Sequence, residues 1–121
     1  MTTQFPIYTS HGDWVAMLVG RYIYDTRGAW IGWVDADSQV FSARGEYAGW
    51  LSQDFRVLTR RDKTTDMLKR EPPPAPPAIT LPVSVPLSPM MAELTFDTVD
   101  LFEERPYKLD PLDMDRVEDI D

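Results

Sequence analysis

The first 61 residues repeat a short pattern of apolar and polar positions. In each copy, two β-prone apolar residues precede two or three polar residues, a glycine, and an apolar run led by an aromatic residue. The copies cover residues 7–18, 23–34 and 40–51, and a truncated fourth copy covers 57–61. This pattern and its spacing of 16 or 17 residues predict one β-hairpin per copy. We therefore expect three full hairpins and one partial hairpin.

A glycine stands at the same place in each full copy, at Gly12, Gly28 and Gly45. The bend of a tight hairpin, or its bulge, needs a positive φ angle, which glycine adopts without steric penalty. The residues between copies are also typical of turns, so consecutive strands should pair as an antiparallel meander. The sequence therefore predicts an all-β fold built from repeated hairpins.

The second strand of each copy carries a small residue four positions after the turn glycine, at Ala16, Gly32 and Gly49. If the copies are arranged around an axis, this position points inward, where the strands crowd together. That arrangement would be a small pseudo-symmetric barrel or flower. The alternative is a chance use of small residues in short strands.

The fourth copy has only its first strand, so its partner strand must come from elsewhere. Natural proteins usually pair or cover an edge strand. Residues 79–81 and 94–96 of the same chain have the apolar character of a strand. A second subunit is the other possible source, and both alternatives stay open at this point.

The repeated unit contains Ile-Tyr, three residues, Gly, one residue, Trp, then Ile or Val and a small residue. It resembles the unit of the bacterial beta-flower proteins, whose hairpins are arranged radially, and it is more loosely similar to WG-type β repeats. The resemblance covers residues 5–61. It implies a fold and no activity, so it assigns no functional residues.

The composition divides the chain into a β-hairpin-repeat domain (1–61), a short helix and Pro-rich linker (62–92), and an acidic-hydrophobic segment (93–121). Residues 62–71 are expected to make one or two helical turns that end before Pro72. Eight prolines between residues 72 and 89 then impose an extended polyproline II spacer. Its proline run at 72–77 is either a plain linker or a ligand for an aromatic groove.

The formal net charge of −8 lies entirely in residues 93–121, which hold eleven acidic and three basic residues. This distribution disfavours nucleic-acid binding and favours a basic partner surface. Apolar residues are spaced through the same segment, as in acidic segments that dock on a protein, and the docking surface is either the β domain of the same chain or a partner. We take Phe96, Leu101, Phe102 and Tyr107 as candidate partner-binding residues.

Basic residues occupy similar positions beside the bends, at His11, Arg27, Arg44 and, in the fourth copy, Arg60. A radial arrangement would gather them at one end of the domain as an anion-binding rim, because guanidinium groups pair with carboxylates and phosphates. The alternative is a set of solvated turn residues. The equivalence of His11 with arginines argues against a catalytic histidine.

No catalytic, metal or cofactor site is predicted. Cysteine is absent, which removes thiolate ligands and cysteine nucleophiles. The acidic residues from Asp110 onward lack the glycine and the register of a calcium loop. The start lacks the features of a signal peptide, and no apolar run approaches the ~20 residues that span a bilayer. We therefore expect a soluble, cytoplasmic, non-enzymatic protein.

These observations favour a protein-interaction or assembly module that binds a protein partner or forms a homo-oligomer. The alternative is a small-ligand or carbohydrate-type binding domain that uses exposed tryptophan. Its candidate stacking platform consists of Trp14, Trp30, Trp33 and Trp50. In so small a domain, however, the same side chains are first needed for the core.

Overall fold

The computed structural model describes residues 3–62 and 68–111. They form one antiparallel sheet in which each strand pairs with the next along the chain. The strands are Gln4–Tyr8 (β1), Trp14–Val19 (β2), Tyr22–Asp25 (β3), Trp30–Val34 (β4), Gln39–Ser42 (β5), Tyr47–Leu51 (β6), Val57–Arg60 (β7) and Thr98–Asp100 (β8). A short helix, α1 (Leu101–Glu104), and a 3-10 turn (Pro106–Lys108) follow. In these described ranges no helix has the length and apolar character needed to cross a membrane.

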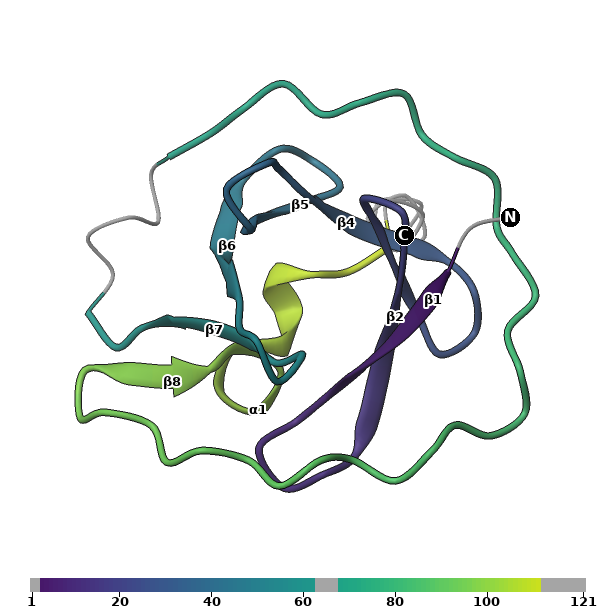
Figure 1. The fold of residues 1–121 in the computed structure, drawn as a ribbon. Helices are drawn as coiled ribbons and strands as arrows, with labels where there is room; N and C mark the ends of the chain where they lie inside the picture. Colours follow the sequence, from purple (N-terminus) through teal and green to yellow (C-terminus); the bar gives the residue numbers. More distant parts are fainter. Residues whose placement is uncertain (1–2, 63–67, 112–121) are drawn as a thin grey trace, which may run out of the picture.

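The eight strands make four consecutive hairpins that surround a centre occupied by α1 (Figure 1). We call these hairpins petals: petal 1 is β1–β2, petal 2 is β3–β4, petal 3 is β5–β6 and petal 4 is β7–β8. The all-β antiparallel meander and the flower-like arrangement are therefore confirmed.

The bends of the first three petals have the same geometry. Gly12, Gly28 and Gly45 have φ angles of 92°, 90° and 91°. Each glycine N–H donates to the carbonyl oxygen three residues earlier, at 2.9, 3.0 and 2.9 Å. The strand register shifts just before each bend, so each bend is a bulged turn. The same bulged turn thus occurs in all three petals, as the repeat predicts.

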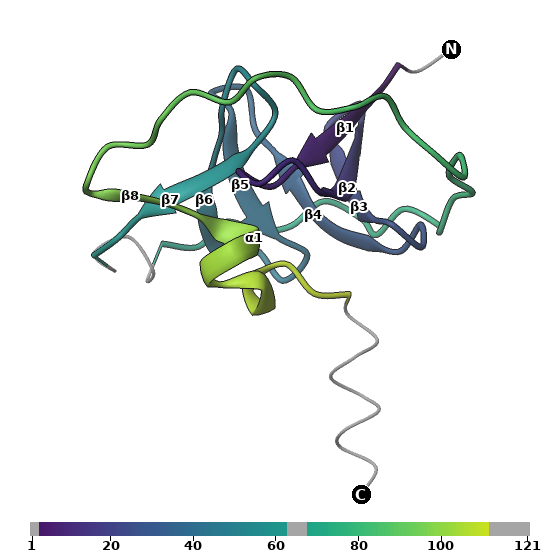
Figure 2. The same ribbon diagram turned by 90° about the horizontal axis from the view of Figure 1, so that it is seen from below.

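The core is a layer of equivalent aliphatic side chains, one from the first strand of each petal. Its four members are completely buried: Ile7, Ile23, Val40 and Val57. Burying side chains of this size contributes about 1.5–3 kcal/mol each. Leu101 of α1 is also completely buried and belongs to the same cluster. Figure 2 shows α1 against one side of the ring of strands.

The small residues of the second strands lie where the strands crowd, as a pseudo-rotational arrangement requires. Ala16 is completely buried. A Cβ atom on Gly32 would lie 2.6 Å from the carbonyl oxygen of Phe41. On Gly49 it would lie 2.0 Å from the carbonyl oxygen of Leu58. Larger residues at these places would push neighbouring strands apart.

The strand that completes petal 4 comes from the same chain. β8 pairs with β7 in the register Thr59↔Val99 and Arg60↔Thr98. It begins two residues beyond the 94–96 segment considered from the sequence, and residues 79–81 form no strand. Residues 98–109, which the composition places in an acidic segment, thus supply a strand and two buried core leucines, Leu101 and Leu109.

Residues 68–97 run round the outside of the petals as an extended segment, which we call the strap (Figure 1). Of the predicted helix at 62–71, residues 63–67 lie outside the described residues. Residues 68–71 are not helical, and Lys69 instead forms an isolated β-bridge with Glu46. The chain here follows the edge of petal 3.

Half-buried side chains recur along the strap at every third residue, with one shift by a single residue at Leu81, and the side chains between them are exposed. The half-buried positions are Pro73, Pro76, Ile79, Leu81, Val85, Ser88, Met91 and Leu94. A period of three is that of the polyproline II helix. The strap therefore presents one edge to the petals and two edges to solvent.

The strap contacts one petal every nine residues: it passes petals 3, 2 and 1, in the reverse of their order along the chain, and then reaches petal 4. The contacts are Arg70 on Gly45, Ile79 on Gly28, Ser88 on Gly12 and Asp97 on Arg61. At the first two, a strap N–H donates to the glycine carbonyl oxygen, at 2.8 and 3.0 Å. Nine residues make three turns of polyproline II helix, so the same edge of the strap meets each petal.

Glycine at the bends also makes room for the strap. A Cβ atom on Gly28 would lie 1.9 Å from the carbonyl oxygen of Ile79, and one on Gly45 would lie 2.1 Å from that of Arg70. These distances are far inside van der Waals contact. The bend residue is therefore constrained twice, by its own φ angle and by the strap backbone.

Gly28→Ala is expected to lower the free energy of unfolding by about 2–3 kcal/mol, because alanine is strained at this φ angle and its Cβ would displace the strap. Urea unfolding followed by tryptophan fluorescence measures the loss. Gly20→Ala is the matched control, since Gly20 has a φ angle of 64° but is exposed between β2 and β3. It should cost about 1 kcal/mol. Equal losses for the two variants would contradict a constraint from the strap.

Candidate functional site

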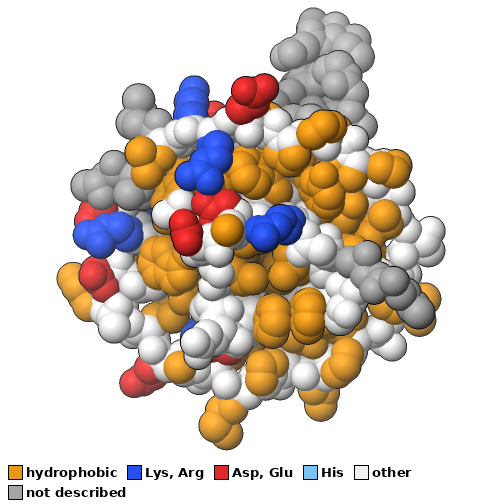
Figure 3. All heavy atoms as spheres, turned by 45° about the horizontal axis from the view of Figure 1, so that its top comes forward, with side chains coloured by type: hydrophobic (Ala, Val, Ile, Leu, Met, Phe, Trp, Pro, Cys, Tyr) orange, Lys and Arg blue, Asp and Glu red, His pale blue; other side chains and the backbone are white. Residues whose placement is uncertain are grey.

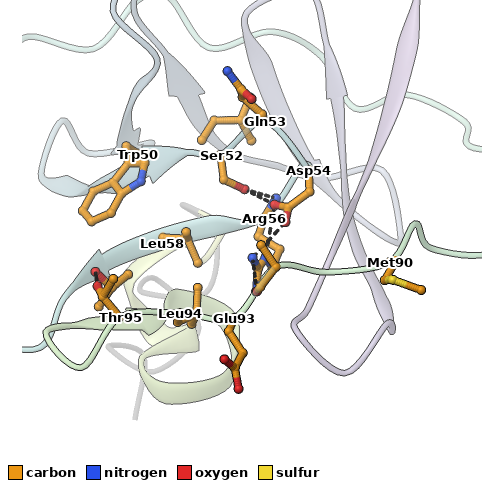
Figure 4. A pocket seen from close by; sticks show the side chains of 13 residues that line it. Trp50, Ser52, Gln53, Asp54, Arg56, Leu58, Met90, Glu93, Leu94 and Thr95 are labelled. Atoms are coloured by element: carbon orange, nitrogen blue, oxygen red, sulfur yellow. Dashed lines mark hydrogen bonds and ion pairs between the residues drawn. The ribbon is translucent and has the colours of Figure 1, made fainter.

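A groove of about 720 Å³ lies between the β6–β7 side of the ring and the strap (Figure 4). Its apolar side chains are Trp50, Leu58, Met90 and Leu94, and its polar ones include Ser52, Asp54, Arg56 and Glu93. The strap forms one wall and petal strands form the other. The groove thus combines a half-buried indole ring with a polar floor.

Arg56 forms the floor of this groove and is only 3% exposed. Its Nε and Nη2 donate to the two carboxylate oxygens of Asp54, at 3.1 and 2.8 Å. Its Nη1 donates to Ser10 Oγ at 2.9 Å, and Nη2 also donates to the carbonyl oxygen of Ala92 at 2.9 Å. One guanidinium group therefore joins petal 1, the β6–β7 turn and the strap.

The charge of Asp54 is stabilised by the same contacts. Burial alone would raise the pKa of Asp54. Hydrogen bonds from Arg56 and Ser52, together with the charge of Arg56, outweigh burial and hold the pKa below its usual value. Asp54 is thus ionised at neutral pH. Four of the five N–H donors of Arg56 have partners within the protein, so this buried arginine is a structural tie between three parts of the chain.

Asp100 lies beside Arg56, where the first and last strands of the sheet approach each other. Its carboxylate accepts hydrogen bonds from Ser10 N and Ser10 Oγ, at 2.7 and 2.8 Å. It also caps α1, accepting from Phe102 N at 3.0 Å and Glu103 N at 3.3 Å. Burial nevertheless raises the pKa of Asp100. Side-chain contacts thus close the seam between petals 1 and 4, where the strand order of the sheet begins and ends.

The candidate rim residues lie at separate petals. His11 Nδ1 contacts Glu103 Oε2. Arg27 Nη2 lies 3.5 Å from Asp25 Oδ2. Arg60 Nη2 lies 3.1 Å from Asp62 Oδ2. Arg44 is exposed. The bends that carry these residues face different sides of the ring (Figure 1), so the described contacts form no shared basic cluster. No group of three His, Asp or Glu residues within 3–62 and 68–111 is placed to hold a metal ion.

The four candidate partner-binding residues divide into two pairs. Leu101 is completely buried and Phe102 packs against the core, so these two serve the domain itself. Phe96 is 87% exposed and Tyr107 is 55% exposed, and both remain accessible to a partner.

The strongest exposed apolar feature was missed from the sequence. Val83, Leu87 and Met90 are 100%, 96% and 97% exposed on the outer edges of the strap. Met90 also lines the groove of Figure 4. The signal that could have found them is the three-residue period, which assigns each apolar residue of an extended segment to an inner or an outer edge.

Comparison with known proteins gives one match. Residues 5–95 match the model of a protein family described as 4-fold beta flower protein. No curated protein and no solved structure matches the chain. The matched range includes the first seven strands and nearly all of the strap, so the match extends beyond the hairpin repeats themselves.

Arg56→Met is expected to lower the free energy of unfolding by about 3 kcal/mol, because it removes two charged donors from the carboxylate of Asp54 and the Arg56 donor from the carbonyl of Ala92. Arg60→Met is the matched control: it breaks a similar Arg–Asp pair, but one that is about half exposed on both sides. That variant should unfold at nearly the wild-type urea concentration. A loss for Arg56→Met no larger than for the control would contradict the role of Arg56 as a tie.

The contact between His11 and Glu103 predicts a dependence of stability on pH. The hydrogen bond and the charge of Glu103 raise the pKa of His11 above 6.5 in the folded protein. The contact therefore stabilises the fold fully below pH 6.5 and loses this effect as the pH rises through the raised pKa. Urea unfolding of wild type and His11→Gln should differ more at pH 5.5 than at pH 8.5. A difference that does not change with pH would contradict this assignment.

Proposed function

The chain belongs to the 4-fold beta flower family, and from this premise we propose that it is a non-catalytic protein-interaction module that presents the outer edge of its strap to a protein partner. Family membership identifies a fold and supplies no activity. The proposal rests on one observation. Three apolar side chains, Val83, Leu87 and Met90, are almost fully exposed on a segment whose inner edge is held against a folded domain.

Large apolar side chains in such a position suit recognition. An isolated exposed side chain is normal on a protein surface, but three nearly fully exposed large apolar side chains within residues 83–90 are typical of an interaction surface. Proline fixes the backbone of this segment at Pro82, Pro86 and Pro89. Because the segment is already ordered, a partner that binds it loses little conformational entropy. Extended proline-rich segments of this kind bind in aromatic-lined grooves.

The negative charge of the chain favours a partner whose binding surface is basic. The full chain carries a net charge of −8. Exposed acidic residues Glu93, Asp97 and Glu104 lie in or just after the strap. A groove with an apolar, aromatic floor and basic flanks complements this surface, because opposite charges steer the two proteins together.

A second candidate is a small-ligand or carbohydrate site at Trp50. Trp50 is half-buried and lines the groove of Figure 4 beside Gln53, Glu93 and Thr95. An indole face with nearby amide, carboxylate and hydroxyl groups suits a neutral sugar ring. A saccharide that binds there would quench the fluorescence of wild-type protein and leave that of Trp50→Phe unchanged.

The triple variant Val83→Ser/Leu87→Ser/Met90→Ser is expected to lose the protein partner while keeping its folding stability, since all three side chains are exposed. Cross-linking in cells of the source organism, followed by mass spectrometry, compares it with wild type. Recovery of the partner should fall about tenfold or more. Ala75→Ser/Ala78→Ser, at exposed positions elsewhere on the strap, is the control and should recover as much as wild type. Identical recovery with the triple variant would contradict the proposal.

A further inference from the structure

A second hollow, of about 530 Å³, lies between petal 2 and the beginning of the strap. Its walls are Tyr22, Trp33 and Val34 from β3 and β4, and Pro73 from the strap. Charged residues, among them Arg21 and Glu71, surround these apolar groups. Figure 3 shows the strap side of the molecule, where hydrophobic side chains cover most of the surface around a small mixed group of charges.

Trp33 carries an unusual polar group for a core residue. Its ring is stacked on Phe41 with the centroids 4.7 Å apart, and the residue is only 8% exposed. Its Nε1 is buried and has no hydrogen-bond acceptor among the described residues. The indole groups of Trp14 and Trp30, in contrast, donate to the carbonyl oxygens of Ala16 and Gly32. A buried N–H without an acceptor is unfavourable, so Trp33, which lines the hollow, carries an unused donor.

The chemistry of this hollow matches an extended proline-rich segment. Aromatic and aliphatic walls accept proline rings, and the carbonyl oxygens of a polyproline II helix have no internal donors. The petals already hold such a segment within the chain. Tyr8 Oη donates to the carbonyl oxygen of Pro86, and Ile79 N donates to Gly28 O at 3.0 Å. An aromatic hollow with an unused indole N–H is therefore suited to the same kind of ligand.

The chain itself carries a suitable ligand next to the hollow. The proline run at 72–77 begins beside Arg70 and Glu71, which line the hollow, and Pro72, Pro74 and Pro77 are exposed. Because receptor and ligand lie side by side on one face, a two-fold axis lets each of two copies insert into the other. The exposed rim residues Arg21 and Glu71 have opposite charges, so the same two-fold arrangement pairs them between copies.

We propose that the Tyr22–Trp33 hollow binds the exposed prolines of residues 72–77 of a second copy, and that this reciprocal contact forms a symmetric dimer. The surface is separate from the outer strap edge at Val83, Leu87 and Met90. Self-association at the hollow and partner binding at the strap edge can therefore be tested independently.

Analytical ultracentrifugation of the full chain, from micromolar to millimolar concentration, tests the dimer. Pro74→Ser changes an exposed residue, leaves the fold intact, and is expected to raise the dimer dissociation constant at least fivefold. Trp33→Phe removes the indole donor and should raise the dissociation constant by a similar factor, because the net contribution of one hydrogen bond corresponds to a change of about this size. Pro89→Ser and Trp14→Phe are the matched controls and should leave the dissociation constant unchanged, because both lie outside the residues that line the hollow. The strap-edge triple variant should also dimerise normally.

A synthetic peptide of residues 70–78 serves as the competitor. It should convert the dimer to monomer, and the same peptide with Pro74→Ser should be less effective. A chain that stays monomeric throughout the concentration range overturns the proposal, as does a dimer that neither variant weakens. If the peptide binds near Trp33 while the chain remains monomeric, the occupant is a proline-rich segment of another protein, and the second-copy assignment is wrong.

Discussion

The contact between the strap and the glycine bends is the constraint on which the rest of the structure depends. At Gly28 and Gly45, two backbones approach so closely that no side chain fits between them. The same residues provide the positive φ angles that turn one strand back on the next. The bend of each petal and the position of the strap are therefore set together. The nine-residue spacing of the strap contacts follows from the ring, because each of the first three petals presents one such bend.

The petals were predictable because their chemistry is local. The residues that define a hairpin, such as Ile7, Gly12 and Ala16, lie within about ten positions of one another, and the repetition of their pattern distinguishes it from chance. The eighth strand could not be found in the same way. Its partner Leu58 lies about forty residues away from Asp100, in a part of the chain with no trace of the repeat. The acidic and apolar residues of 98–109 indicated a segment that docks on a protein surface, but they did not show that Leu101 and Leu109 complete the core of the same domain.

For the candidate functional residues too, the sequence predicted local positions but not which residues meet in space. Equivalent positions in a repeat were correctly placed beside the bends, but the sequence did not reveal that the bends face outward in different directions. His11 and Arg60 therefore contact acidic neighbours at their own petals. The buried tie at Arg56 involves groups from residues 10, 54 and 92, a combination that only the closed ring brings together. In the strap, the three-residue period of half-buried positions could not be recognised from the prolines, because prolines lie on its inner and outer edges alike.

The reverse course of the strap has a consequence for how the protein is made. A ribosome releases petals 1, 2 and 3 first, at a stage when nothing yet fills the centre of the ring. The strap then passes back over the finished hairpins, and Leu101 reaches the middle only after a full circuit. Contacts between such distant residues form slowly, since a long loop must close before they stabilise the fold. Completion of the domain is therefore a late event. Until residues 98–109 dock, the first three hairpins lack the side chain of Leu101 in their core.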